Sequence, residues 1–343
     1  MKQQANIKSK PHIMVLFCGG TIIMKEDKRG VLVPPNEEEA LNVLIELEPR
    51  LLDMADLEIQ MVINIDSSNM QPSHWDKMAE IIHARYADFD GFVITHGTDT
   101  MAYTAAALSL CLGNLGKPVI LTGSQIPGYR LNSDASRNFI NAVQLASMDL
   151  SGVYILFDER IISGTRATKS SESRLDAFRT VNRLDAGEVR LKIHLGSQIP
   201  KRKKSLPKLK TGFCSDIVTI SLTPGIDPTD LIFLLENKKI KGIIIEAFGT
   251  GNIPKNFKPF FKKAGELKVP VIVCSQCLHG MTMMKSYAEG KEALDAGTIE
   301  GFDQSLEMLS VKLMWALKHE SYKNIKKVLN RNFAGELDTA YLG

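Results

Sequence analysis

Short apolar runs that end at polar turns recur through the first half of the chain. Residues 13–17, 91–95, 118–121 and 153–157 are each four or five residues long and mostly apolar. Runs of this length, bounded by turn residues, are typical of buried strands. Residues 57–65 instead alternate apolar with mostly polar side chains, which predicts a strand with one buried face.

Helical patterns separate these strands. Residues 75–86 place apolar side chains at helical spacing, with Ser73 as the expected N-cap and Asp76 three residues later. The alanine-rich residues 102–112 and residues 134–148 predict two more helices. Repeated units of strand, polar turn and helix predict a parallel sheet with helices on both faces. In such sheets ligands bind beyond the carboxyl ends of the strands, where these polar turns fall.

The second half of the chain repeats the pattern on a smaller scale. Residues 217–222, 242–247 and 269–274 predict strands with helices between them. The length of 343 residues also favours two domains. We therefore predict an α/β protein that has a larger, doubly wound and mostly parallel N-terminal domain, a linker and a smaller C-terminal α/β domain. The predicted ranges are 1–195, 196–211 and 212–343.

The composition is that of a soluble globular protein, with 44% hydrophobic and 24% charged residues and a net charge of +3. No apolar run reaches membrane-spanning length, and the polar residues 1–10 lack the apolar stretch of a secretory signal. Five cysteines, an odd number, favour free thiols in a reducing compartment, so we expect a cytoplasmic protein with no membrane partner. The basic residues 201–204 lack interleaved aromatic side chains, which favours a solvated linker over a nucleic-acid surface.

Two polar turns at strand ends carry candidate chemistry. Thr21 follows Gly19 and Gly20, so the backbone can bend sharply and place the hydroxyl beside exposed N–H groups. That geometry suits a nucleophile, although from this turn alone a helix N-cap or a contact with a small anion is favoured. Residues 96–100 carry two hydroxyls, an imidazole and a carboxylate. A helix cap needs only one short polar side chain, so a functional site is at least as good an interpretation.

A threonine nucleophile needs a base to take its proton. Lys169 is a candidate, although a single lysine in a polar loop is usually a solvated charge. His96 is another by its titration range, but a histidine beside glycine at a strand end is as easily a hydrogen-bonded structural residue. Cys274, Cys277 and His279 supply too few ligands for zinc, so we expect neither a metal nor a cofactor.

Taken together, the polar motifs resemble those of the asparaginase family, and most closely its cytoplasmic, type I branch. The motifs are Gly19-Gly20-Thr21-Ile22, Asp66-Ser67-Ser68-Asn69-Met70, residues 96–103, residues 122–127 and Arg166-Ala167-Thr168-Lys169. The resemblance continues through residues 248–252, Gln276-Cys277 and residues 331–337, and so covers nearly the whole chain. Gly-Gly-Thr alone is a weak signal, but these motifs in family order and spacing are a strong one.

The resemblance implies a fold, an assembly and a reaction. Two α/β domains are expected, with active sites built between the N-terminal domain of one subunit and the C-terminal domain of a neighbour, and hence a homodimer or homotetramer. The expected reaction is hydrolysis of L-asparagine to L-aspartate and ammonia, with L-glutamine as a poorer substrate. Thr21 would be the nucleophile that forms an acyl-enzyme, while Thr98, Asp99 and Lys169 would activate a nucleophile or water.

The resemblance also implies how the substrate is held. Asp99 and Ser67 would bind its α-amino and α-carboxylate groups, and the loop at Ser124 would line the amide pocket. Backbone N–H groups of the glycine turn and of Thr98 would stabilise the oxyanion. The expected substrate-binding residues are Gly20, Ser67, Ser68, Gly97 and Ser124.

Six positions depart from the family pattern; Cys18 and Asn69 remove no nucleophile, and the other four bear on activity. Ile23 stands where a small residue is usual, and Val31 where many relatives carry a tyrosine that touches the nucleophile. Trp315 stands where some type I members use a tyrosine, and an indole only donates hydrogen bonds, so it cannot relay a proton. Ala167 stands where allosteric members can carry a threonine, which predicts a simple rather than sigmoidal dependence on substrate.

These departures leave two further functions open. One is a catalytically weak or inactive homologue that binds an amino acid as a sensor or regulator. The other is an amidase that acts on a larger amide, such as an amino acid attached to RNA, and the basic linker motivates it. We rank the second low because we find no segment that matches the expected extra tRNA-binding part.

Overall fold

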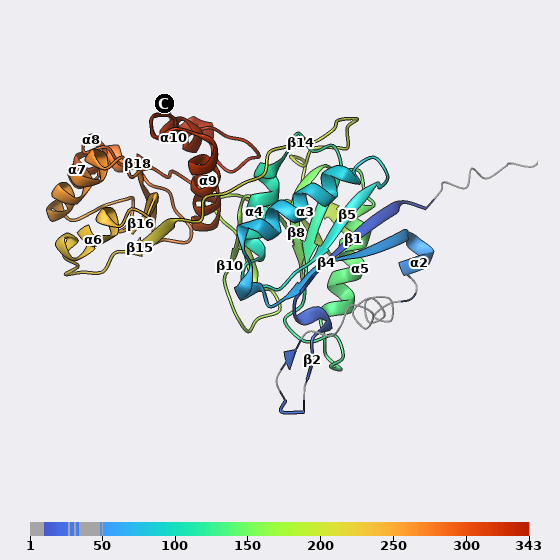
Figure 1. Cartoon of the computed structure of the whole chain (residues 1–343). Coiled ribbons are helices and arrows are strands. Elements are labelled where there is room, and N and C mark those ends of the chain that lie inside the picture. The colour runs from blue at the N-terminus through green and yellow to red at the C-terminus, as the bar shows by residue number, and fades with distance from the viewer. Residues whose placement is uncertain (1–9, 27, 31, 34–48, 50, 343) are drawn as a thin grey trace, which may run out of the picture.

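Two α/β domains follow one another along the chain (Figure 1). The computed structural model describes residues 10–26, 28–30, 32–33, 49 and 51–342. The N-terminal domain is built on an eight-stranded sheet with the strand order β13-β12-β9-β8-β7-β5-β1-β4, and the C-terminal domain on a four-stranded sheet with the order β15-β16-β17-β18. The predicted fold, with a larger, doubly wound and mostly parallel N-terminal sheet and a smaller C-terminal α/β domain, is confirmed.

The N-terminal sheet is parallel from β8 to β4 and antiparallel at its other edge. No pattern in the sequence predicted the antiparallel edge. Strands β8 and β9 are joined by the two-residue turn of Asp158 and Glu159, which lacks the glycine that marks most such hairpins, although Asp158 adopts a positive φ of 53°. The strands are β1 (His12–Gly19), β4 (Asp56–Ile65), β5 (Gly91–Thr95), β7 (Pro118–Thr122), β8 (Gly152–Phe157), β9 (Arg160–Ser163), β12 (Gly187–Val189) and β13 (Ile193–Leu195).

Helices cover both faces of this sheet. One face packs against α3 (Pro72–Ala84) and α4 (Met101–Cys111), and the other against α2 (Leu51–Met54) and α5 (Ala135–Ala146). All residues of α4 except Tyr103 are buried, as expected for a helix enclosed on every side. No helix among the described residues is long and apolar enough to cross a bilayer.

The start of α3 differs from the prediction. Pro72 occupies the first helical position and Gln71 is the N-cap, so Ser73 lies inside the first turn. Proline is favoured at this position because its fixed φ suits the helix and its missing N–H would be unpaired there anyway. Asp76, expected to complete a capping box, instead accepts a hydrogen bond from the Gly212 N–H at 2.8 Å.

The C-terminal sheet is entirely parallel and also has helices on both faces. The helix α9 packs against α4, and their side chains share one apolar cluster that joins the two domains. The strands are β15 (Ile217–Ser221), β16 (Gly242–Ala247), β17 (Val271–Ser275) and β18 (Ile299–Glu300). The helices are α6 (Ile232–Glu236), α7 (Lys258–Glu266) and α8 (Ala288–Asp295) on one face, with α9 (Leu306–His319) and α10 (Tyr322–Leu329) on the other.

Short elements connect and decorate the two sheets. Three two-stranded antiparallel pairs are formed by β2 (Lys25–Glu26) with β3 (Leu32–Val33), β6 (Leu112–Gly113) with β14 (Lys208–Leu209), and β10 (Ala167–Lys169) with β11 (Phe178–Thr180). The 3-10 turns are η1 (Thr21–Ile23), η2 (Ser67–Asn69), η3 (Pro228–Leu231), η4 (Lys255–Phe257), η5 (Met284–Ser286) and η6 (Thr339–Leu342). The turns η1 and η2 and the hairpin of β10 and β11 carry residues of the candidate site.

The basic segment between the domains is less free than the predicted solvated linker. Arg202 donates hydrogen bonds to the carbonyl oxygens of Met148 at 2.6 Å and Ala146 at 2.7 Å, which anchors the segment to the N-terminal domain. The neighbouring Lys201, Lys203 and Lys204 are exposed, as predicted. The domain boundaries at residues 195 and 211 stay a prediction.

Candidate active site

The polar turns that follow β1, β4 and β5 lie against one another. A Cβ atom added to Gly20 would lie 2.6 Å from the backbone nitrogen of Gly97, and one added to Gly97 would lie 2.6 Å from Ser67 Oγ. No larger residue fits at either place unless its neighbours move. The two glycines therefore allow the turns that contain Thr21, Ser67 and Thr98 to pack together at one edge of the sheet.

Lys169 bridges Thr98 and Asp99 at this edge. Its Nζ lies 2.7 Å from Thr98 Oγ1 and 2.6 Å from Asp99 Oδ1. Thr98 and Asp99 come from the turn after β5, whereas Lys169 ends β10, so residues 70 positions apart meet here. Thr98 is 8% exposed, but the side chain of Asp99 is 60% exposed. The group is therefore closed on its protein side and open to solvent beyond Asp99.

Gln125 also contacts this group, although it is not among the predicted site residues. The Thr98 hydroxyl donates to Gln125 Oε1 at 3.3 Å, and Gln125 Nε2 donates to the carbonyl oxygens of Glu172 and Arg174, each at 3.0 Å. Gln125 thus orients the Thr98 hydroxyl and ties it to the loop after Lys169. Its place directly after Ser124 at the end of a buried strand was the available signal.

Thr21 and Ser67 each begin a 3-10 turn at the same edge. Thr21 is partly buried and follows Gly20, whose φ of 96° is in the region that favours glycine. Ser67 is 4% exposed, and its carbonyl oxygen accepts a hydrogen bond from Thr100 Oγ1 at 2.8 Å. Thr100 therefore fixes the turn of Ser67 against the turn that carries Thr98.

Ser68 and Ser124, two other predicted substrate contacts, differ in how their hydroxyls are used. The Ser68 hydroxyl donates to Asp66 at 2.6 Å, and this bond helps to lower the pKa of the Asp66 carboxyl. The Ser68 side chain therefore stabilises the turn in which it lies. Ser124 is 1% exposed, and its Oγ has no hydrogen-bond partner in the part of the chain that the structure describes.

His96 is a structural residue rather than a base. It is fully buried, its Nδ1 lies 2.6 Å from the Gly97 carbonyl oxygen, and its Nε2 lies 2.9 Å from Thr104 Oγ1. Trp75 Nε1 donates to the same Thr104 oxygen at 3.0 Å, so we assign the Thr104 proton to His96 Nε2 and the imidazole proton to Nδ1. Burial lowers the pKa of His96 to about 4, which keeps the ring neutral.

Trp315 lies in the apolar cluster between the domains. Its indole Nε1 donates to the Lys210 carbonyl oxygen at 3.1 Å, and its ring packs against His319 and Phe333. Only 5% of Trp315 is exposed, so within this chain it is a residue that packs α9 and not a residue of the candidate active site.

Of the other departures from the family pattern that bear on activity, Ala167 lies within the described residues. Ala167 is 2% exposed and packs into the N-terminal core, so it faces away from any ligand. The adjacent Thr168 faces the domain interface instead. The side chain of Ile23 and the whole of Val31 lie outside the described residues.

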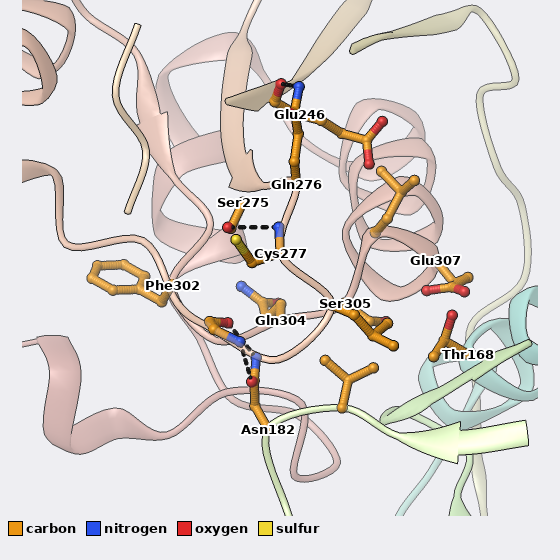
Figure 2. A pocket seen from close by; sticks show the side chains of 14 residues that line it. Thr168, Asn182, Glu246, Ser275, Gln276, Cys277, Phe302, Gln304, Ser305 and Glu307 are labelled. Carbon is orange, nitrogen blue, oxygen red and sulfur yellow. Dashed lines mark hydrogen bonds between the residues drawn. The ribbon is translucent and has the colours of Figure 1, made fainter. Parts of the chain in front are cut away.

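A cavity of about 170 Å³ lies between the two domains (Figure 2). Its lining includes Thr168 from the N-terminal domain and Glu246, Gln276 and Glu307 from the C-terminal domain. None of the four predicted catalytic residues lines it, and it approaches them only through Thr168, the neighbour of Lys169. We therefore place the candidate catalytic group at the open sheet edge and not in this cavity.

The lining of the cavity is acidic. It contains the carboxylates of Glu246 and Glu307 and, among the described residues, no lysine, arginine or histidine. Burial raises the pKa of Glu307, and the nearby charge of Glu246 acts in the same direction. Burial and these two carboxylates also raise the pKa of Tyr103 to about 12. Such a cavity favours a neutral or positively charged guest over an anion.

The cysteines show no arrangement suited to a metal. All five are free thiols, and Cys277 is exposed. Burial, with a contribution from Glu246, raises the pKa of the Cys274 thiol to about 12, so this side chain stays protonated and does not favour a cation. Within residues 10–26, 28–30, 32–33, 49 and 51–342, no three His, Cys, Asp or Glu side chains are grouped to hold a metal ion.

Two family models match the chain, one for each domain. The model described as "Asparaginase, N-terminal" matches residues 12–201, and the model described as "Glutaminase/Asparaginase C-terminal domain" matches residues 216–329. Together they cover both sheets and the turns described above.

Curated relatives of similar sequence fall into two kinds. The chain is 36% identical to L-asparaginase 1 of Escherichia coli, over 96% of this chain and 98% of that protein. It is 34% identical to the L-asparaginase of Thermococcus kodakarensis, over 95% of this chain and 98% of that protein. It is also 34% identical to one component of the glutamyl-tRNA(Gln) amidotransferase of Pyrococcus abyssi, over 95% of this chain and 77% of that component.

Solved structures agree with the sequence matches. The thermostable L-asparaginase from Thermococcus kodakarensis superposes with a TM-score of 0.87 at 33% identity and covers 95% of this chain and 99% of its own. L-asparaginase I from Vibrio cholerae gives a TM-score of 0.86 at 35% identity, with 96% and 100% covered. A probable cytoplasmic L-asparaginase from Campylobacter jejuni gives 0.77 at 27% identity, with 94% and 100% covered.

Proposed function

Because this chain belongs to the asparaginase family over both of its domains, we propose that it is an amidohydrolase that converts L-asparagine to L-aspartate and ammonia through a threonine acyl-enzyme. The observation that carries the proposal is the group of Lys169, Thr98 and Asp99 beside the turn of Thr21. The relatives that match nearly end to end and are named L-asparaginases support the same reaction.

In the proposed first half of the reaction, Thr21 Oγ attacks the side-chain amide carbon of the substrate. The carbonyl oxygen becomes an oxyanion, which backbone N–H groups of the glycine turn and of Thr98 stabilise. The proton released by the Thr21 hydroxyl passes to the amide nitrogen, the C–N bond breaks and ammonia leaves, so an aspartyl ester stays on Thr21. The positive φ of Gly20 supports this role because it turns the backbone sharply just before the nucleophile.

In the second half, a water molecule attacks the ester. In this step the Thr98 hydroxyl turns from Gln125 towards Lys169 Nζ, 2.7 Å away, and gives it a proton while taking one from the water, and Asp99 stabilises the resulting ammonium at 2.6 Å. The bond between Thr21 Oγ and the acyl carbon then breaks, Lys169 returns the proton through Thr98 to Thr21 Oγ, and aspartate leaves. Lys169 must hold or pass a proton at each turnover, and the two short contacts restrict its amine to one position between the hydroxyl and the carboxylate.

The proposed substrate site lies along the same turns. Asp99 holds the α-amino group, Ser67 the α-carboxylate, and Ser124 lines the amide pocket, while Gly20, Ser68 and Gly97 shape the floor. The large exposed fraction of Asp99 supports a contact with a ligand. Glutamine carries one more methylene, which changes discrimination by only about 1–3 kcal/mol, so we expect it to be a poorer substrate rather than an excluded one.

We also propose a homodimer or homotetramer in the cytoplasm. The Lys169 group is open to solvent on the Asp99 side, and the N-terminal domain displays three almost fully exposed leucines, Leu131, Leu184 and Leu191, which a second copy would cover. The free cysteines and the likeness to a probable cytoplasmic L-asparaginase support the compartment. Light scattering on the purified protein tests the assembly, and a monomer at micromolar concentration would rule it out.

An ammonia assay on L-asparagine and L-glutamine tests the reaction. We expect Thr21→Ala and Thr98→Ala to abolish ammonia release, while Thr219→Ala, which deletes an exposed hydroxyl in β15, keeps it. Release that survives Thr21→Ala would contradict the acyl-enzyme. Stabilisation of the wild-type protein by asparagine without ammonia would instead favour the sensor or regulator.

The 34% identity to a component of a glutamyl-tRNA(Gln) amidotransferase supports a second candidate, release of ammonia for transfer to an amino acid attached to tRNA. The same assay separates the two. A free-standing asparaginase turns over asparagine alone, whereas an amidotransferase component needs charged tRNA or a partner protein for full rate. Binding of tRNA that weakens steeply with added salt would favour this second candidate.

A further inference from the structure

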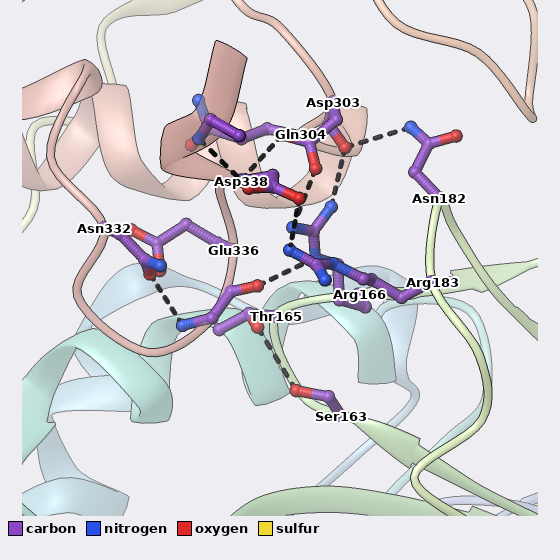
Figure 3. Close-up of polar contacts among 12 residues, drawn as sticks. Ser163, Thr165, Arg166, Asn182, Arg183, Asp303, Gln304, Asn332, Glu336 and Asp338 are labelled. Carbon is purple, nitrogen blue, oxygen red and sulfur yellow. Dashed lines mark hydrogen bonds and ion pairs between the residues drawn. The ribbon is translucent and has the colours of Figure 1, made fainter. Parts of the chain in front are cut away.

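The start of the hairpin that carries Lys169 is inserted into the C-terminal domain (Figure 3). Arg166, three residues before Lys169, is 1% exposed although it is charged. Its Nε donates to the Gly335 carbonyl oxygen at 2.9 Å and its Nη1 to the Asp303 carbonyl oxygen at 2.8 Å. Its Nη2 lies 3.0 Å from Asp303 Oδ2 as an ion pair. The guanidinium is therefore fixed by three contacts from the other domain.

The C-terminal side of this contact is held rigidly. Glu336 is fully buried, accepts hydrogen bonds from the Phe333 and Ala334 N–H groups, and pairs with Lys312 at 2.8 Å. These bonds fold residues 332–336 into a turn. The turn presents the Gly335 carbonyl oxygen to Arg166 and the Ala334 carbonyl oxygen to Thr165 Oγ1 at 3.2 Å.

The far end of the hairpin is held by the same part of the C-terminal domain. Asn182, two residues after β11, donates to the carbonyl oxygens of Gly280 at 2.6 Å and Asp303 at 3.0 Å, and accepts from the Gly280 N–H at 2.9 Å. The Val181 N–H donates to the Arg166 carbonyl oxygen at 2.8 Å, which joins the two ends of the hairpin. Both ends are thus anchored across the domain interface, with Lys169 between them.

Stability alone is a poor reason for such a pair. Replacing a buried ion pair by well-packed apolar side chains is often neutral or stabilising, because the desolvation of the charges offsets their attraction. What Arg166 supplies is direction, since its Nε and Nη1 donate to the Gly335 and Asp303 carbonyl oxygens from a planar fork that a lysine or an apolar side chain lacks, while the ion pair balances its buried charge. The position of the guanidinium therefore sets the position of the backbone that enters β10.

We propose that Arg166, paired with Asp303, is a positioning residue through which the C-terminal domain sets the place of Lys169 against Thr98 and Asp99. The two residues between Arg166 and Lys169 are in the extended strand β10, so a displacement at Arg166 passes along the backbone to Lys169. Misplacing a catalytic group by about 1 Å can cost about 10²-fold in rate. The role assigned to Lys169 rests on the proposed function, whereas the docking of the hairpin does not.

Three variants separate positioning from folding. Arg166→Gln leaves the Asp303 carboxylate buried and unpaired, so it lowers thermal stability as well as activity. The double variant Arg166→Gln with Asp303→Asn removes both charges and is expected to regain most of that stability. The control Arg183→Gln breaks a second ion pair between hairpin and C-terminal segment, Arg183 Nη2 to Asp338 Oδ2 at 3.1 Å, whose side chains are 41% and 33% exposed.

The measurements are kcat and KM for ammonia release, the thermal unfolding midpoint, and hydrogen exchange of peptides that cover residues 167–180. We expect the double variant to keep a kcat about 10²-fold below wild type with little change in KM, and to exchange faster in this hairpin. Arg183→Gln is expected to stay within about twofold of wild type. A double variant with wild-type kcat and wild-type exchange would overturn the proposal.

The exchange measurement also separates this proposal from the proposed function. If the wild-type protein released no ammonia, the proposed function would fail, and the hairpin exchange of the double variant would still decide whether Arg166 and Asp303 hold the hairpin. Faster exchange would support the docking and unchanged exchange would refute it.

Discussion

Lys169 has a hydroxyl on its buried side and a carboxylate on its exposed side, and the roles proposed for the two neighbours follow this difference. The Thr98 hydroxyl is shielded from water, whereas Asp99 is accessible to a ligand. In the proposed reaction a proton therefore moves between Lys169 and Thr98 away from bulk solvent, while Asp99 contacts the substrate. The contact from Gln125 completes the orientation of the hydroxyl.

The first prediction concerns the proton on Lys169. Lys169→Arg keeps a positive charge beside Asp99, but a guanidinium does not give up its proton at neutral pH. We expect kcat to fall by about 10²–10⁴-fold while the unfolding midpoint changes little. Lys208→Arg, at an exposed position in β14, is the matched control and should keep wild-type kcat. An active Lys169→Arg variant would show that Lys169 only provides charge.

The second prediction concerns His96 and pH. Its pKa in the folded protein is about 4, below its ordinary value of 6.5, so in this window the unfolded chain binds one more proton than the folded one. The free energy of unfolding should therefore fall as the pH falls from about 6.5 to about 4, by about 1.4 kcal/mol per pH unit from this residue. Urea unfolding of wild type and His96→Gln measures the difference in slope. Equal slopes would contradict the assignment.

At the scale of single residues, the sequence predicted which side chains belong to the candidate site better than it predicted which residues they contact. Thr98, Asp99 and Lys169 could be selected from motifs, and the structure brings them within hydrogen-bonding distance. Gln125 lies in one of the motifs, but neither its contact with Thr98 nor that of Asp303 with Arg166 could be predicted, because each depends on how separate turns approach in space. A pattern of apolar positions or a motif describes one segment, whereas these contacts join segments far apart in the chain.

At the scale of elements, the candidate site depends on turns that nearly touch. The third prediction uses two glycines with similar φ, 96° at Gly20 and 89° at Gly225. Alanine costs about 1–2 kcal/mol at either position through its backbone. Only at Gly20 would the new methyl group also collide with backbone atoms of Gly97, since Gly225 has open space around it. We expect Gly20→Ala to lose activity and Gly225→Ala to keep it, as measured by ammonia release and urea unfolding.

If both glycine variants kept wild-type activity, the close approach of the two turns would not matter for the reaction. If both lost it, general destabilisation would explain the loss. Only a loss of activity in Gly20→Ala, with activity kept in Gly225→Ala, supports a site built by the contact between the turns.

The elements themselves were predictable where one strong pattern decided them. Apolar runs identified most of the parallel strands because burial on both faces leaves no alternation to misread. Alternation identified β4, and the two-residue strand β18 is too short to give a pattern. The antiparallel edge and the cap of α3 were missed because each depends on local turn chemistry, a positive φ at Asp158 and a proline at the first helical position. The docking of Arg202 was missed because its acceptors are backbone carbonyl groups, which no sequence pattern marks.

At the scale of the whole molecule, buried charges and an apolar cluster join the domains. The fourth prediction concerns Lys312 and Glu336, which are both fully buried. Lys312→Met leaves the Glu336 carboxylate without its counter-charge and should lower the free energy of unfolding by about 3–5 kcal/mol. The exposed pair of Lys291 and Asp295 is the control, because Lys291→Met should cost about 0.5 kcal/mol or less.

Chemical denaturation of these variants measures the costs. Adding Glu336→Gln to Lys312→Met removes the unpaired charge and should recover much of the loss. A single Lys312→Met variant that is as stable as wild type would mean that the turn of residues 332–336 does not need the pair, and would weaken the account of how the C-terminal domain is held rigid.

In the proposed reaction Thr21 carries the acyl group, while Lys169 and Thr98 transfer the protons. The most direct test is to quench the protein with acid during turnover of L-asparagine, digest it and locate any aspartyl ester by mass spectrometry. The account predicts an ester on the peptide that contains Thr21 and no ester in Thr21→Ala. An ester on Thr98, or one that still forms in Thr21→Ala, would contradict it.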